Sequence, residues 1–199
     1  ELYCQIKDNC VNKVSLIGHS WGAWLVVLFA EKYPEMINNV IMVGSGPLED
    51  KYVSEIGTRR FKNLSEEDSM VFKRLNNNET TDEDMKRIPY ILEKSDNYCL
   101  ENKEKHTADK TDSEMHNKVW REAAKLRTDG ELLKCFKNVK SRLYLIQGEY
   151  DPHPAKGVTI PLQENGVRCE IHILKKCGHS PFMEKYARGE FYKIILGII

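Results

Sequence analysis

The chain of 199 residues has no long hydrophobic run and no excess of charge of either sign. A membrane-spanning helix needs roughly 20 consecutive apolar residues, whereas the longest apolar run here covers only residues 23–30. Lysine plus arginine and aspartate plus glutamate number 30 each, so the composition gives no sign of a basic surface. We therefore expect neither nucleic acid nor a membrane as a partner.

Cysteine pairs and metal-like spacings are also missing. The six cysteines are scattered without a Cys-x-x-Cys pair, which favours free thiols in a reducing, cytoplasmic compartment over a disulfide framework. Four histidines show no metal-like spacing and are interpreted as structural or surface residues: His106, His116, His153 and His172. We expect no metal and no cofactor.

A short glycine-flanked motif is the most informative feature that is present. Gly18-His19-Ser20-Trp21-Gly22 follows the apolar run 14–17 and precedes the apolar run 23–30, which predicts a strand, a sharp turn and a helix. A serine at such a turn needs small residues two positions to either side, because strand and helix pass closely there. Gly18 and Gly22 meet this need, so Ser20 is the candidate nucleophile. The alternative is a turn serine at an inert junction.

A serine nucleophile requires a base, and the base requires an orienting carboxylate. Residues 141–147 predict a strand that ends in a turn carrying Asp151, and residues 170–174 predict a strand followed by His179. The chain order of serine, aspartate and histidine is typical of one hydrolase architecture and differs from the orders of the two best-known serine protease folds.

Each of these residues has an alternative interpretation. Asp151 precedes Pro152 and can simply cap a turn, and His179 can be a structural histidine. Glu149 is a rival carboxylate, but it lies two residues nearer the strand and is expected to point elsewhere. Cys177 lies two residues before His179, and we expect its thiol to project from the other face of the turn. His19, beside the serine, is interpreted as a packing residue.

These motifs together resemble the α/β-hydrolases over the whole length of the chain. The resemblance rests on the nucleophile elbow Gly18–Gly22, the turn Gly148-Glu149-Tyr150-Asp151 and the turn Gly178-His179-Ser180-Pro181. It implies that Ser20 is the nucleophile and His179 the general base and acid. It further implies that Asp151 holds the imidazole tautomer and that the backbone N–H of Trp21 is one of two oxyanion donors.

The same resemblance indicates that an N-terminal part is missing. In this family several strands precede the nucleophile strand, together with a loop, often beginning His-Gly, that donates the second oxyanion N–H. The chain instead opens on Leu2, Ile6 and Cys10 at helix-like spacing, has no initiator Met and contains no His-Gly or Gly-Gly pair. Loss of one oxyanion donor lowers turnover about 10²–10³-fold. We therefore expect these residues alone to be weakly active and to pair with the missing half or with a second copy. The sequence does not decide whether the protein carries a signal peptide.

The periodicity predicts an α/β fold with a parallel sheet flanked by helices, which the resemblance implies is the C-terminal part of a mostly parallel sheet. The expected strands cover residues 14–18, 39–44, 141–147 and 170–174. Residues 47–138 are rich in charged and amide side chains and carry no strand-like run. This segment is too long for a simple crossover between strands, and it resembles the helical cap that many α/β-hydrolases place over the nucleophile, inserted here into a core of residues 1–46 and 139–199. The alternative is a solvated helical excursion.

Three helices are expected within this insertion. Their predicted starts are at Ser65, at Thr81, with an interruption at Pro89, and at His116, whose helix reaches Leu126. Four large side chains of the insertion either line a substrate pocket or, as we expect for most of them, form its own core: Tyr90, Tyr98, Met115 and Trp120.

The sequence therefore predicts a serine hydrolase that cleaves a small ester or amide through an acyl-enzyme. The serine excludes haloalkane dehalogenases and epoxide hydrolases of this fold, which need an aspartate at position 20. A proline-iminopeptidase-like aminopeptidase, acting on a short peptide through cap carboxylates that bind the free amine, is one alternative. A non-catalytic binding protein of the same fold is the other.

Overall fold

The computed structural model describes residues 1–76, 79, 81–101 and 113–199. Its centre is a four-stranded parallel sheet in the order β1-β2-β3-β4, formed by Val14–His19, Ile37–Val43, Arg142–Gly148 and Glu170–Leu174. Strands that follow one another in the chain are also neighbours in the sheet and pair in parallel. The predicted α/β class and all four predicted strands are confirmed.

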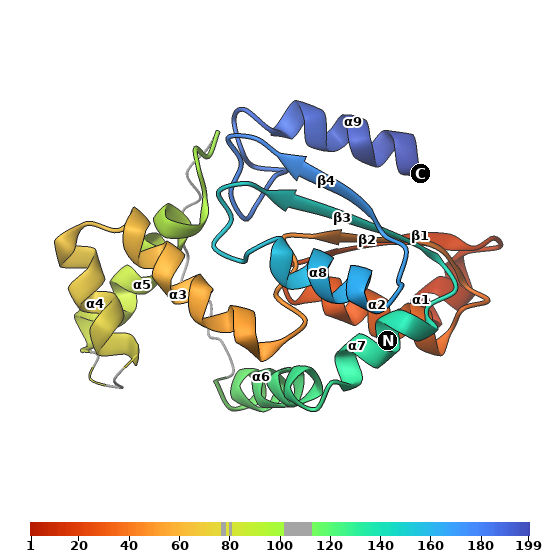
Figure 1. The fold of residues 1–199 in the computed structure, drawn as a ribbon, viewed down its shortest axis with the longest axis horizontal. Coiled ribbons are helices and arrows are strands. Elements are labelled where there is room, and N and C mark those ends of the chain that lie inside the picture. Colours follow the sequence, from red (N-terminus) through yellow and green to blue (C-terminus); the bar gives the residue numbers. More distant parts are fainter. Residues whose placement is uncertain (77–78, 80, 102–112) are drawn as a thin grey trace.

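The two central strands are hydrophobic at nearly every position because both faces of the sheet are covered. In β2, Val40 and Met42 pack into one hydrophobic cluster, whereas Ile41 and Val43 pack into a second cluster on the opposite face. The first face is covered by α2 (Gly22–Lys32), α7 (Glu131–Asn138) and α8 (Lys156–Glu164), and the second by α9 (Arg188–Ile198). Figure 1 shows the sheet between these layers, with α9 on the side away from α2, α7 and α8. The short helix α1 (Leu2–Asn9) adds Ile6 to the first cluster.

Between β2 and β3 the described residues form helices joined by loops. This segment contains the 3₁₀ turn η1 (Asp50–Tyr52) and the helices α3 (Val53–Asn63), α4 (Glu66–Asn76), α5 (Asp82–Asp96) and α6 (Ser113–Thr128), followed by α7. Figure 1 shows α4 and α5 set to one side of the sheet, with α3 leading towards them. Val71 and Phe72 of α4 pack on Ile88 and Ile91 of α5 in a small cluster of their own.

Helix α5 confirms one predicted boundary and corrects another. It begins after Thr81 with a capping box in which Thr81 and Asp84 satisfy each other's backbone N–H groups, as the sequence predicts. The predicted interruption at Pro89 is wrong, because the helix continues through it to Asp96. Proline removes one backbone donor, but Ile88 and Ile91 on either side are buried in the α4–α5 cluster, and this packing maintains the helix.

The last part of the helical segment packs against the sheet layer. Ala123 of α6 and Leu132 and Phe136 of α7 belong to the same buried cluster as α2. The division of the chain into a core of residues 1–46 and 139–199 and a cap of residues 47–138 stays a prediction.

Within the described part of the chain, no helix is both long enough and apolar enough to cross a bilayer. All six cysteines are unpaired thiols.

Candidate active site

The turn after β1 holds Ser20 in an unusual backbone conformation. Its φ is +57°, in the left-handed region that is unfavourable by about 1–2 kcal/mol for residues other than glycine. The backbone N–H of Ser20 donates to the carbonyl of Val43 at 2.8 Å, which fixes the turn to the end of β2. The N–H of Trp21 donates no hydrogen bond to any residue that the structure describes. A free N–H beside a strained serine is the arrangement expected at a nucleophilic turn.

The two glycines of this turn differ in what they permit. A Cβ on Gly18 would lie 2.1 Å from the carbonyl oxygen of Gly22, so no larger residue fits there. A Cβ on Gly22 would meet no described atom within 4 Å outside its own helix and neighbours. The close passage of strand and helix therefore requires Gly18. The expectation that Gly22 is needed for the same reason is wrong, because α2 leaves open space at that position.

Asp151 and His179 are brought together from the ends of β3 and β4. The Asp151 side chain is completely buried, and its Oδ2 accepts hydrogen bonds from His179 Nδ1 at 3.0 Å and from Gln147 Nε2 at 2.9 Å. Burial alone would raise the pKa of Asp151, but hydrogen bonds from His153 and His179 outweigh it and lower this pKa. Burial alone would lower the pKa of His179, but the bond to Asp151 and its charge raise it. The carboxylate is therefore ionised and fixes Nδ1 of His179 as a donor.

The loop that follows β4 reaches across the sheet to the end of β2. A Cβ on Gly44, which follows β2, would lie 2.8 Å from the backbone oxygen of His179 and 3.0 Å from its Nδ1. His19, the neighbour of Ser20, hydrogen-bonds the same His179 oxygen through Nε2 at 2.8 Å. Ser20 and His179 thus lie at the same edge of the sheet. No hydrogen bond joins them in the described part of the chain, and catalytic hydrogen bonds are often long in unliganded enzymes.

Comparison with known proteins identifies the fold family. A family model described as alpha/beta hydrolase fold matches residues 11–186. The chain belongs to the α/β-hydrolase fold family. Its four-stranded parallel sheet flanked by helices is the corresponding part of that fold.

Solved α/β-hydrolase structures resemble the chain over almost its entire length. VinJ matches with a TM-score of 0.67 at 13% identity, over 98% of this chain and 69% of VinJ. A proline iminopeptidase of Mycobacterium smegmatis matches with a TM-score of 0.61 at 15% identity, over 98% of this chain and 67% of the other. A monoacylglycerol lipase of Paleococcus ferrophilus matches with a TM-score of 0.56 at 16% identity, over 98% and 71%. No curated protein matches the chain by sequence. At such identities the structural matches show the fold alone.

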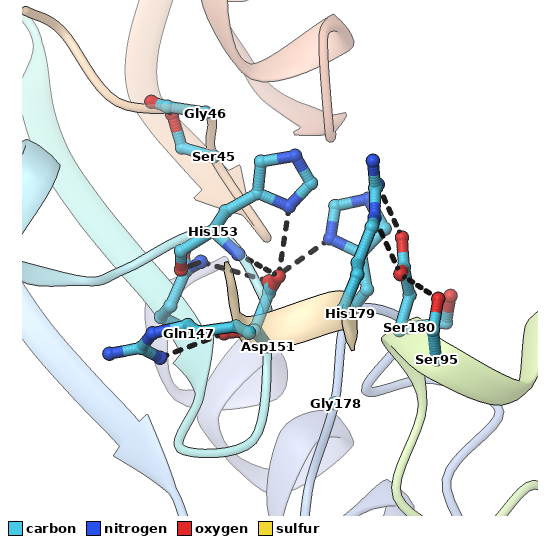
Figure 2. A network of polar contacts seen from close by, with 12 residues as sticks. Ser45, Gly46, Ser95, Gln147, Asp151, His153, Gly178, His179 and Ser180 are labelled. Carbon is cyan, nitrogen blue, oxygen red and sulfur yellow. Dashed lines mark hydrogen bonds and ion pairs between the residues drawn. The ribbon is translucent and has the colours of Figure 1, made fainter. Parts of the chain in front are cut away.

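His153 also belongs to this site, although the sequence predicted only a structural or surface role for it. Its Nδ1 lies 2.9 Å from Asp151 Oδ1, and its backbone N–H donates to the same oxygen at 2.8 Å. Figure 2 shows the Asp151 carboxylate between the rings of His153 and His179, whose centroids are 4.6 Å apart. The signal was the spacing Asp-Pro-His, because a residue two positions after an aspartate donates its N–H back to that carboxylate in a turn. Asp151 therefore caps a turn and also holds His179.

Asp151, His153 and His179 also offer ligand atoms that all lie within 4.8 Å of one another. Carboxylate oxygen and imidazole nitrogen are suitable ligands for zinc and related ions. In this structure, however, both Nδ1 atoms are already engaged by the carboxylate oxygens, so hydrogen bonds account fully for the arrangement.

The side chains of Glu149, Cys177 and His172, the other candidate residues from the sequence, take no part in the described hydrogen bonds around Asp151 and His179. Glu149 is exposed, whereas Asp151 is buried. Cys177 is buried, and burial raises the pKa of its thiol, so it is a poor nucleophile. His172 lies on β4 beside Glu170, at 2.9 Å from its carboxylate. His106 and the side chains of Met115 and His116 lie outside the described residues.

A cavity of about 300 Å³ opens between α5 and the loop that carries His179. Leu92, Leu100 and Met183 give it an apolar part, and its lining also includes Glu93 and His179. The expected aromatic residues do not line it. Tyr90 and Tyr98 line a neighbouring cavity of about 230 Å³. Both tyrosines and Trp120 are about half exposed, so the expectation that most of these side chains form a helical core is wrong.

Proposed function

We propose that this chain carries the catalytic residues of a serine hydrolase that cleaves a small ester or amide. The observation that carries the proposal is the strained Ser20 turn lying beside His19 and Gly44, both of which contact His179, with His179 bonded to the buried Asp151. A buried, ionised carboxylate behind an imidazole is the device that lets a histidine accept a proton from a serine.

In the proposed reaction Ser20 Oγ attacks the carbonyl carbon while His179 Nε2 takes the hydroxyl proton. The carbonyl oxygen becomes an oxyanion, and the free N–H of Trp21 stabilises it. His179 then returns the proton to the departing alcohol or amine, and the acyl group stays on Ser20. A water molecule, deprotonated by His179, hydrolyses the acyl-enzyme and restores the serine.

The cavity beside His179 fits the departing part of the substrate, because His179 is the group that protonates it. Leu92, Leu100 and Met183 favour an apolar group of modest size. In this proposal residues 47–138 act as a cap over the serine, which excludes water from the acyl-enzyme. A small-molecule ester is the leading substrate class, and we expect the protein to act in the cytoplasm.

Cleavage of a short peptide from its free amino end is the second candidate. Glu93 on the rim of the same cavity is a carboxylate of the kind that binds an ammonium group. The two candidates are separated by comparing nitrophenyl esters with aminoacyl and prolyl nitroanilides as substrates of the full-length protein.

Labelling with a fluorophosphonate probe tests the proposal itself. We expect the full-length protein to be labelled and Ser20→Ala to be unlabelled. His179→Gln and His153→Gln form a matched pair, since both rings contact Asp151. Labelling should disappear in His179→Gln and persist in His153→Gln. Absence of labelling in the wild type at every pH would favour a non-catalytic binding protein.

A further inference from the structure

A second buried carboxylate lies close to His179 and has no part in the proposed proton transfer. The side chain of Glu184 is fully buried and accepts three backbone hydrogen bonds. Its Oε1 accepts from the N–H of Gly178 at 2.7 Å and from that of Tyr98 at 2.6 Å, and its Oε2 accepts from Cys99 at 2.7 Å. A buried charge is strongly unfavourable unless it is paired or hydrogen-bonded, and N–H bonds to a carboxylate are among the strong ones. Glu184 therefore joins the chain around residue 98 to the residue before His179.

Further hydrogen bonds connect the same two segments. The N–H of His179 itself donates to the carbonyl of Asp96 at 2.7 Å. The N–H of Ser180 donates to Asn97 Oδ1 at 3.1 Å. Beyond them, the N–H of Lys185 donates to the carbonyl of Cys99 at 2.8 Å. The backbone on both sides of the imidazole is thus held by residues 96–99.

The contact between the segments is as close as backbone atoms allow. A Cβ on Gly178 would lie 2.3 Å from the carbonyl oxygen of Asp96. The Asp96 carboxylate is itself fixed by Arg60, which donates through Nε at 2.8 Å and through an Nη at 2.6 Å. Residues 96–99 are therefore anchored to α3 as well, and the loop cannot shift without them.

We propose that Glu184 is a positioning residue for His179, through which the helical segment between β2 and β3 sets the placement of the catalytic base. The inference rests on the proposed function. His179 has to keep its Nδ1 on Asp151 while its Nε2 reaches Ser20, so its backbone must be fixed. A misplacement of about 1 Å lowers the rate of a positioned reaction about 100-fold.

Replacement of Glu184 by glutamine tests this role against a purely structural one. Glutamine has the same size, but its NH₂ group would face backbone N–H donors instead of accepting from them. In the full-length Glu184→Gln protein we expect kcat per fluorophosphonate-titrated site to fall about 10- to 100-fold, with little change in KM. We also expect the acid limb of the rate profile to move to lower pH, because the hydrogen bond that His179 Nδ1 donates to Asp151, which raises the pKa of His179, loosens. Glu190→Gln, which alters an exposed carboxylate on α9, is the matched control and should behave as the wild type.

Titration of active sites separates the two roles. A variant with fewer folded molecules, but with a wild-type kcat per titrated site and an unchanged pH profile, would overturn the inference. If Glu184→Gln does not fold, Glu184→Asp decides, because it keeps the charge and shortens the side chain by one carbon. We expect it to show the same two changes to a smaller extent, and wild-type values would again overturn the inference.

One measurement does not depend on activity. The proton between His179 Nδ1 and Asp151 should give a downfield resonance in ¹H NMR that is absent from His179→Gln. We expect the resonance to persist in Glu190→Gln and to weaken or vanish in the Glu184 variants. Persistence at full intensity in a folded Glu184 variant contradicts the inference. Failure of wild-type labelling, by contrast, contradicts only the proposed function.

Discussion

His19 donates a hydrogen bond of 2.8 Å from its Nε2 to the backbone carbonyl of His179. The centroid of its ring lies 4.7 Å from that of the His179 ring. The same ring packs edge-on against Phe182, with the centroids 5.0 Å apart. Burial and the nearby His179 lower the pKa of His19, so at neutral pH it is an uncharged ring whose proton is on Nε2. The residue before Ser20 thus holds the loop of the proposed base, a role beyond the packing expected from the sequence.

Replacement of His19 by phenylalanine should weaken this connection while keeping an aromatic ring in place. The carbonyl of His179 would lose a donor, and an unsatisfied buried carbonyl is unfavourable by about 1–3 kcal/mol. We expect a lower melting temperature and a reduced kcat with a similar KM. Chemical denaturation and steady-state kinetics measure both. Wild-type values for stability and kcat would show that the hydrogen bond has no role.

The pH dependence of kcat/KM should reflect the raised pKa of His179. A general base must be neutral to accept a proton, so activity is expected to rise with pH through a midpoint above the ordinary histidine value of 6.5. Asp151→Asn removes the charge and hydrogen bond that raise this pKa, so the midpoint should move down while kcat falls about 10⁴-fold. A wild-type midpoint below 6.5 would contradict the assignment.

His153→Gln should destabilise the protein more than it slows catalysis. Asp151 keeps His179 and Gln147 as partners but loses the imidazole of His153, and a hydrogen bond to a charged group contributes about 1.5–3 kcal/mol. Because the hydrogen bonds from His153 and His179 lower the pKa of Asp151, their contribution is present above the unfolded carboxyl pKa of 3.8 and is lost as pH falls. Urea unfolding should therefore show a difference from wild type at pH 7 that narrows at acidic pH. An equal difference at both pH values would exclude this cause.

Gly18→Ala and Gly22→Ala form a matched pair at the Ser20 turn. Alanine at position 18 would place its Cβ 2.1 Å from a backbone oxygen, and we expect a loss of about 3 kcal/mol or more. Alanine at position 22 meets open space at the first residue of α2, where it should be neutral or stabilise the helix by up to about 1 kcal/mol. Thermal melts of the two variants measure both effects. Equal destabilisation would show that strand and helix approach closely at both glycines.

The sheet was predictable because its central strands are covered on both faces. A continuous apolar run such as residues 40–43 is then required, and the run is visible in the sequence. The common location of Ser20, Asp151 and His179 was predictable for a related reason. Each follows a strand of one parallel sheet, so all three lie at the same edge.

The contacts between loops were not predictable to the same extent. Glu184 looks like one charged residue among many, and only the fold buries it against residues 98, 99 and 178. His153 has no metal-like spacing in the sequence, and only the turn that closes on Asp151 brings its ring to that carboxylate. The continuation of α5 through Pro89 depends on packing between α4 and α5, which local preference does not contain.

The positive φ of Ser20 has a thermodynamic consequence for the protein as a whole. Glycine at this position would relieve about 1 kcal/mol of backbone strain, so an inactive Ser20→Gly protein should be more stable than the native one. Selection for folding alone would favour that replacement. A serine in this conformation is what the proposed nucleophilic role predicts, and directed evolution towards heat resistance, without a screen for turnover, should discard it early.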